Sequence, residues 1–271
     1  MTNFEYVLLG ASFIAISAGI VGVWLVLRKE ALRSDVVTHS VLPGIGIAFL
    51  LFQEKKLWLL LLGAFVTSLL SLVSLDTLSK HTRLKKDTLM ALVLSFFFAC
   101  GLWLLVKIQE SKNAAKTGLG NFIFGKMASI LPEDILFALI VLFLVVTINF
   151  LTYRWLFFTS FDRTFSESIG VKTSLASFIV TFMSILTIVV GIQAVGVVML
   201  SALLIIPSTI AIIIEKKNLS RIFVWSIGIN ILVIVIGTIL SYSFPKTPTG
   251  AWIVVICFLI ALVFFLKNNK K

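Results

Sequence analysis

Residues 6–27 read YVLLGASFIAISAGIVGVWLVL, a continuous apolar run without a charged side chain. A helix that crosses the hydrocarbon core of a bilayer needs about 20 mostly apolar residues. The run is therefore long enough to cross a membrane as one helix. It also lacks the basic start that precedes a cleavable signal peptide, so we expect it to stay in the protein.

The composition of the whole chain matches the character of this run. Of 271 residues, 59% are hydrophobic and 13% are charged, and the mean hydropathy is +1.12. Ordinary soluble domains carry about 25% charged residues, so the chain is predicted to be an all-α, polytopic membrane protein. No linker separates a second domain, and residues 1–271 are expected to form a single transmembrane domain.

Further apolar segments predict eight or nine transmembrane helices in total. The candidate segments lie at 6–27, 36–52, 57–78, 88–108, 134–152, 174–192, 195–214, 221–242 and 250–266. The second of them is short and is interrupted by Pro43 and Gly44. Almost nothing separates the sixth from the seventh, so these two could form one span and reduce the number to eight.

The positive charges predict the orientation of the chain. If the tail at 267–271 is cytoplasmic, the segments at 28–33, 79–87, 153–173 and 215–221 lie on the same side. Together they hold most of the 23 Lys and Arg residues, as the cytoplasmic segments of membrane proteins do. With nine spans, the N-terminus is then outside and the C-terminus is in the cytoplasm.

Two ionisable residues, Asp35 and His39, stand out because nearly all the other acidic residues lie in loops or at helix ends. If residues 30–41 are helical, the two side chains are four residues apart and share one face. A carboxylate and an imidazole on adjacent turns can bind one divalent cation. Two copies of the chain would supply two of each, a set that suits zinc or manganese. The alternative is a structural hydrogen bond between Asp35 and His39.

Helix-breaking and small residues mark two further stretches. Pro43 and Gly44 follow the Asp–His pair and predict a break in the helix, because proline removes a backbone donor and clashes with the preceding turn. Broken helices occur at substrate sites in transporters, although a packing kink is the alternative. From Gly196 through Ser201 to Pro207, small residues interrupt an apolar helix, and close helix packing is favoured there over lining a pore.

The segment at 153–173 is too polar to cross the membrane. It includes Phe161, Asp162, Glu167 and Gly170, and it is expected to form a short helix that ends at the glycine. Such a helix in the cytoplasm can contact a partner, or it can be a simple connector. The sequence has no GxxxxGK[ST] phosphate-binding loop, so any ATP hydrolysis that drives transport must take place on another chain.

In six motifs the chain resembles the permease subunits of bacterial ATP-binding-cassette importers for zinc, manganese and related divalent metals. The first motif is LRSDVVTHSVLPG at 32–44, where Ser34, Thr38 and Val41 replace the usual Gly, Ser and Ala. The others, in family order, are LKKD at 84–87, FG at 124–125 with PED at 132–134, SFD at 160–162 through Gly170, the stretch from Gly196 to Pro207, and PTG at 248–250.

The resemblance implies a homodimeric permease, a docked ATPase dimer that binds ATP, and an extracytoplasmic protein that delivers zinc, manganese or iron. It implies that Asp35 and His39 bind the metal in the translocation path. It also implies that the segment from Asp162 to Gly170 couples transport to the ATPase. A bacterial cytoplasmic (inner) membrane location follows, with no enzymatic activity in the chain itself, no permanently bound cofactor and no nucleic-acid partner.

Three other functions remain open on the sequence. A permease for a larger solute, such as a siderophore or vitamin, would need a wide cavity but no buried Asp–His pair. An intramembrane metalloprotease would be expected to carry HExxH, whereas the chain has only two histidines, far apart. A proton-driven transporter would have no use for a segment that contacts an ATPase.

Overall fold

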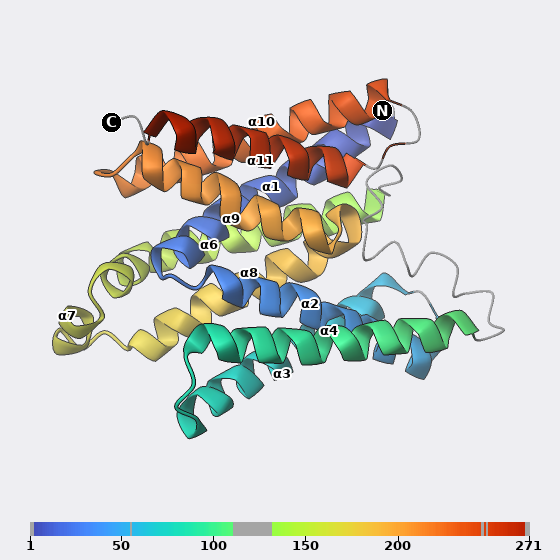
Figure 1. The fold of residues 1–271 in the computed structure, drawn as a ribbon, viewed down its shortest axis with the longest axis horizontal. Helices are drawn as coiled ribbons and strands as arrows, with labels where there is room; N and C mark the ends of the chain where they lie inside the picture. Colours follow the sequence, from blue (N-terminus) through green and yellow to red (C-terminus); the bar gives the residue numbers. More distant parts are fainter. Residues whose placement is uncertain (1–2, 55, 111–131, 245–246, 248, 269–271) are drawn as a thin grey trace.

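Long helices make up almost all of the computed structural model, which describes residues 3–54, 56–110, 132–244, 247 and 249–268 (Figure 1). The helices are α1 (Asn3–Leu27), α2 (Ala31–Phe52), α3 (Leu57–His81), α4 (Lys86–Glu110), α6 (Pro132–Phe161), α7 (Arg163–Ser168), α8 (Thr173–Val195), α9 (Val197–Ile214), α10 (Leu219–Ser243) and α11 (Thr249–Asn268). All of them except α7 are long and apolar enough to cross a membrane, which gives nine candidate spans in these residues. The predicted all-α polytopic fold is confirmed, and the described residues hold nine candidate spans rather than eight.

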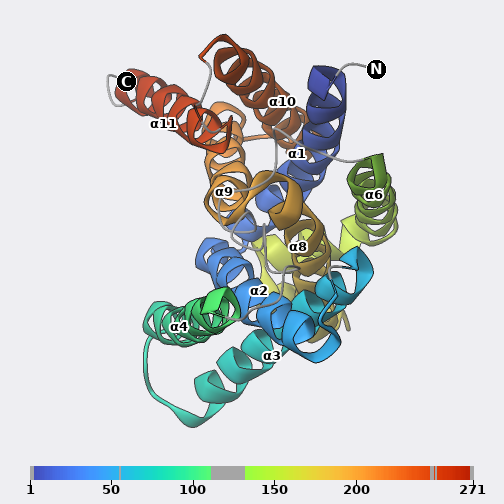
Figure 2. The same ribbon diagram turned by 90° about the vertical axis from the view of Figure 1, so that its right-hand side faces the viewer.

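Helix α8 occupies the centre of the bundle, between two groups of helices (Figure 2). On one side, α2 packs against α3 and α4, and on the other, α1 packs against α6, α9 and α10, with α11 against α9 and α10. Helix α8 contacts α1, α2, α3 and α6, so it joins the two groups. Helix α1 begins and α11 ends at opposite ends of the bundle (Figure 1).

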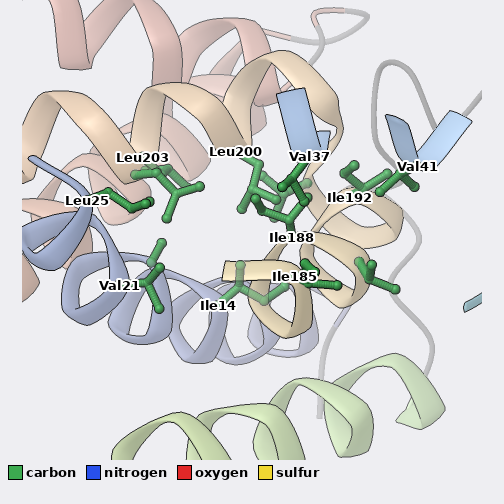
Figure 3. Packing of buried hydrophobic residues seen from close by; sticks show 14 of the residues in the cluster. Ile14, Val21, Leu25, Val37, Val41, Ile185, Ile188, Ile192, Leu200 and Leu203 are labelled. Carbon is green, nitrogen blue, oxygen red and sulfur yellow. The ribbon is translucent and has the colours of Figure 1, made fainter. Parts of the chain in front are cut away.

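The core between α1, α2, α8 and α9 consists of aliphatic side chains. Figure 3 shows Val37 and Val41 of α2 beside Ile188 and Ile192 of α8, with Leu200 of α9 close by, and all five are buried. Side chains packed this closely hold one arrangement, because adding or removing even a single methylene group disturbs the packing. The core therefore fixes which face of α2 points at α8.

The peripheral helices expose large apolar side chains on their outer surfaces. Phe143 and Phe150 of α6 are 71% and 81% exposed, and Val224 of α10 is 71% exposed. Soluble proteins rarely carry such extensive apolar patches, whereas lipid chains solvate them without cost. The chain is a multi-pass membrane protein.

The structure corrects two details of the predicted second span. Helix α2 has 22 residues and is not short, because it begins at Ala31, ahead of the purely apolar part of the sequence. It also continues through Pro43 to Phe52, so the predicted break does not occur. Gly101 of α4 leaves room for the proline ring, since a Cβ at that position would lie 2.9 Å from Pro43 Cδ. Membrane helices tolerate proline where neighbouring helices cover the lost backbone bond.

Helix α6 extends further than the sequence indicated. It has 30 residues and continues to Phe161, so the first part of the segment expected to be polar and non-spanning is helical. Leu156 and Thr159 on this extension are buried, because α6 packs against α1 and α8. The short helix expected in this segment is α7, and it ends two residues before Gly170. The motif residues at 124–125 and Pro248 lie outside the described residues.

Candidate functional site

Asp35 and His39 lie in the first half of α2, four residues apart and on one face. Neither side chain is fully buried. The Asp35 carboxylate lies beside the Ser201 hydroxyl of α9 and close to the His39 imidazole, while the Ser201 hydroxyl donates to the Val197 carbonyl of its own helix at 3.4 Å. Two helices that are far apart in the sequence therefore bring a carboxylate, an imidazole and a hydroxyl together.

The ring of Phe98 in α4 packs against the His39 imidazole. The ring centroids are 4.8 Å apart and the planes meet at 77°, an edge-to-face contact that orients the imidazole. Nδ1 of His39 is buried and has no hydrogen-bond partner within the described ranges. A buried polar atom without a partner costs free energy, so a ligand that bonds to the imidazole would remove a penalty.

The pair provides fewer ligands than a metal site normally uses. In the part of the chain that the structure describes, no three His, Cys, Asp or Glu residues are grouped so that they could hold a metal ion. Protein zinc sites use three or four protein ligands, and manganese also prefers several oxygen and nitrogen donors. Within one copy of the chain, Asp35 and His39 are therefore too few to make up such a site.

Close helix contacts hold α2 in place on its other side. A Cβ on Gly44 of α2 would overlap the carbonyl oxygen of Gly63 in α3, and a Cβ on Gly63 would overlap that of Gly44. Nearby, Ser71 of α3 donates a hydrogen bond to Ser40 of α2 at 3.0 Å. At 3.6 residues per turn, Ser40 and Gly44 lie roughly opposite Asp35 and His39. The contacts with α3 thus turn the Asp–His face away from α3.

Helix α9 is positioned by a sharp turn and by polar contacts at its far end. Gly196 separates α8 from α9 with φ +90°, a conformation that residues with a side chain rarely adopt. Pro207 and Ser208 are buried within α9. The Ser208 and Ser226 hydroxyls share a hydrogen bond at 3.0 Å, and Ser226 also donates to the Gly19 carbonyl of α1 at 3.0 Å. These contacts fix the position of α9 along its own axis. They therefore determine where Ser201 lies beside Asp35.

The segment around α7 is ordered by its own polar groups. Asp162 caps the helix, since its Oδ1 accepts from the Phe165 N–H at 2.9 Å. Glu167 Oε1 accepts from the Thr173 hydroxyl at 2.9 Å, and Gly170 adopts φ +80°. At the same time Phe161, Phe165 and Ile169 are 62%, 51% and 49% exposed. The segment is therefore a turn held by hydrogen bonds that exposes apolar side chains, and α7 lies at one end of the bundle (Figure 1).

The residues that stood out in the sequence lie in three separate regions of the structure. Asp35, His39 and Ser201 meet between α2 and α9, and Pro43 and Gly44 lie where α2 contacts α4 and α3. The stretch from Phe161 to Gly170 lies apart from these two regions, at the end of the bundle where α6 ends and α8 begins. Sequence reasoning missed Phe98, because no spacing rule connects a residue in α4 with one in α2.

Comparison with known proteins gives one family. Residues 2–268 match the model of the family described as the ABC 3 transport family. The zinc transport system membrane protein TroC of Treponema pallidum (strain Nichols) is 35% identical over 274 residues, which cover 98% of this chain and 89% of that protein. The manganese import system permease protein ScaB of Streptococcus gordonii is 28% identical over 264 residues, covering 97% and 91%.

The helix arrangement also has a solved counterpart. A chain in the structure of PsaBC from Streptococcus pneumoniae in complex with Fab matches with a TM-score of 0.86 and 24% sequence identity. The match covers 98% of this chain and 91% of that chain. At this level of identity the likeness concerns the fold, and function has to be argued from the site.

Proposed function

Because the chain belongs to the ABC 3 transport family, we propose that it is the membrane-spanning permease of an ATP-binding-cassette importer for divalent metal ions. Residues 1–271 act as a single transmembrane domain in this proposal, and the chain itself is not an enzyme. The two relatives are named for zinc and manganese transport. Carboxylate and imidazole ligands also suit iron, so zinc, manganese and iron are the candidate cargoes.

The Asp35–His39 pair carries this proposal. Ionisable groups within membrane spans are costly and mark ion or substrate paths. The negative charge of Asp35 favours a cation over a neutral or anionic solute, and the carboxylate and imidazole can replace part of the hydration shell of the ion. A siderophore or a vitamin would gain little from these two groups.

A second copy of the chain completes the site in this proposal. Related by a two-fold axis, two permeases contribute two Asp35 carboxylates and two His39 imidazoles, which matches the number of ligands in a zinc site. The partial ligand set of one chain supports this arrangement. The metal then passes along the interface between the two copies.

ATP hydrolysis on separate cytoplasmic subunits drives the transport step. The sequence has no phosphate-binding loop of its own, and the segment from Phe161 to Gly170 offers exposed apolar side chains for an ATPase dimer. An extracytoplasmic binding protein delivers the metal to the opposite side. The protein lies in the bacterial cytoplasmic membrane, with the start of α1 outside and the end of α11 inside.

Metal uptake into vesicles tests the proposed function. The chain is coexpressed with its ATPase and binding protein, and uptake of zinc, manganese and iron is compared with and without ATP. We expect ATP-dependent uptake of at least one of these metals. An intact, ATPase-bound complex that takes up none of them would refute metal transport and favour another solute.

Phe165→Asp is expected to weaken ATPase docking, because it places a charge on the exposed apolar face of α7. Central apolar residues of an interface contribute enough for a loss of about tenfold or more in affinity. The measurement is the amount of ATPase that copurifies with the tagged permease. Phe244→Asp is a matched control, since Phe244 is 52% exposed and follows α10 at the opposite end of the bundle. Equal copurification with both variants would rule out α7 as the docking segment.

A further inference from the structure

Arg28 connects the end of α1 to the helices on both sides of α7. Its side chain is only 8% exposed. The guanidinium donates from Nη1 to the Thr159 hydroxyl at 3.2 Å and from Nη2 to the Ser177 hydroxyl. Thr159 lies in the last turn of α6, and Ser177 lies near the start of α8. A displacement of the α6–α7–α8 corner would therefore move Arg28.

Ion pairs continue from Arg28 to the start of α2. Glu30 lies 3.8 Å from Arg28 through Oε2 and 3.8 Å from Arg33 through Oε1. Arg33 in turn lies 3.4 Å from Asp76 of α3. The turn that carries these residues is tight, with φ +57° at Lys29. The charged side chains of this turn thus connect α1 with the first turn of α2 and with the end of α3.

The ion pairs of Glu30 are too long to be hydrogen bonds. Charge-assisted N–H···O bonds are about 2.7–2.9 Å long, so closing either pair needs a shift of about 1 Å. Glu30 Oε2 and Arg33 Nε are buried, and neither has a hydrogen-bond partner in the described part of the chain. Shortening these pairs would therefore be electrostatically favourable.

We propose that Arg28 and Glu30 are positioning residues that transmit movement of the α7 corner to the Asp35–His39 pair. Asp35 lies two residues beyond Arg33 on the same helix, so a shift at the start of α2 moves its carboxylate relative to Ser201 of α9. The inference rests on the proposed function, because it takes α7 as the ATPase contact and Asp35 as a metal ligand. It adds the physical connection between the two sites.

The test measures coupling in liposomes that contain the permease, its ATPase and the binding protein. Metal uptake and ATP hydrolysis are recorded in the same sample, and zinc and manganese binding to the purified permease is measured separately. For Arg28→Gln we expect about a tenfold fall in metal carried per ATP hydrolysed, with metal binding unchanged. Arg28→Lys should recover part of the ratio. Arg83→Gln, at an exposed position in the turn after α3, is the control and should keep the wild-type ratio.

A second variant keeps Arg28 and removes its two acceptors. Thr159→Val with Ser177→Ala keeps the Arg28 guanidinium. This double variant therefore tests the role of its hydrogen bonds even if Arg28→Gln fails to fold. The same fall in metal carried per ATP hydrolysed supports the proposal. A wild-type ratio in this double variant overturns it, and so does a parallel loss of metal binding and transport, which would indicate a merely structural role.

A distance measurement tests this inference independently of whether the protein transports a metal. Spin labels at Leu32→Cys and Lys216→Cys, with Cys100 and Cys257 replaced by serine, report the start of α2 against the end of α9. ATP should change this distance in the otherwise wild-type complex but not in the Thr159→Val, Ser177→Ala variant. That result supports the connection even if no metal is carried, whereas an equal ATP response in both proteins refutes it.

Discussion

Asp35→Ala and His39→Ala are each expected to reduce ATP-driven metal uptake to background. Replacing a residue that merely supports a metal ligand costs about 10- to 100-fold, so losing a ligand should cost at least about a hundredfold. Asp35 provides the only carboxylate in the Asp35–His39–Ser201 cluster, and His39 the only imidazole. The measurement is initial uptake of the cargo metal into vesicles that contain the permease, the ATPase and the binding protein.

Ser201→Ala provides the graded comparison for these two variants. It removes the hydroxyl beside Asp35 and leaves both candidate ligands, so we expect a loss of no more than about fivefold, which corresponds to about 1 kcal/mol. All three variants should assemble with the ATPase, because Asp35, His39 and Ser201 are not fully buried. Normal transport by both alanine variants of the pair would end its assignment as metal ligands and leave it a structural role.

Gly44→Ala is expected to destabilise the protein strongly. Its new Cβ would overlap the Gly63 carbonyl oxygen and the Thr67 hydroxyl of α3, and backbone atoms cannot move aside as a side chain can. Overpacking of this kind costs about 3 kcal/mol, which corresponds to a fall in Tm of about 10 °C for a protein of this size. Thermal unfolding of the purified permease in detergent measures the shift.

Gly228→Ala is the matched control for this substitution. Gly228 also lies within a helix, α10, but apart from the neighbouring backbone of that helix no atom lies within 4 Å of the position that its Cβ would take. Alanine favours helix by up to about 1 kcal/mol over glycine, so this change should leave Tm unchanged or raise it. A Gly44→Ala protein as stable as Gly228→Ala would show that α2 and α3 do not pack backbone to backbone.

Hydrophobicity alone was enough to predict the helical membrane fold, because a span needs only length and apolar character. Proline showed the limit of this local reasoning. The chemistry of Pro43 favours a break, yet α2 continues through it, since packing between α2, α3 and α4 holds the helix together. The extension of α6 to Phe161 has the same origin, because burial of Leu156 against neighbouring helices outweighs the polarity around it.

Only part of the candidate site could be predicted from the sequence. Asp35 and His39 could be found because ionisable side chains are rare in apolar segments, and their spacing of four places them on one face. Ser201 and Phe98 join them only through tertiary packing, which no sequence period encodes. Arg28 and Glu30 were hidden for another reason, since charges next to a helix end look like ordinary solvated charges, whereas the structure leaves their side chains only 8% and 20% exposed.

The opposite placement of the start of α1 and the end of α11 has a genetic consequence. The described residues contain nine candidate spans, an odd number. If each crosses the bilayer once, the start of α1 and the end of α11 face different compartments. A tandem gene that joined the end of α11 in one copy directly to α1 of another would insert the second copy upside down. The two halves of a parallel pair must then be translated as separate polypeptides, unless the fusion gains an extra crossing. In the proposed pair, every substitution would therefore appear twice, once in each copy.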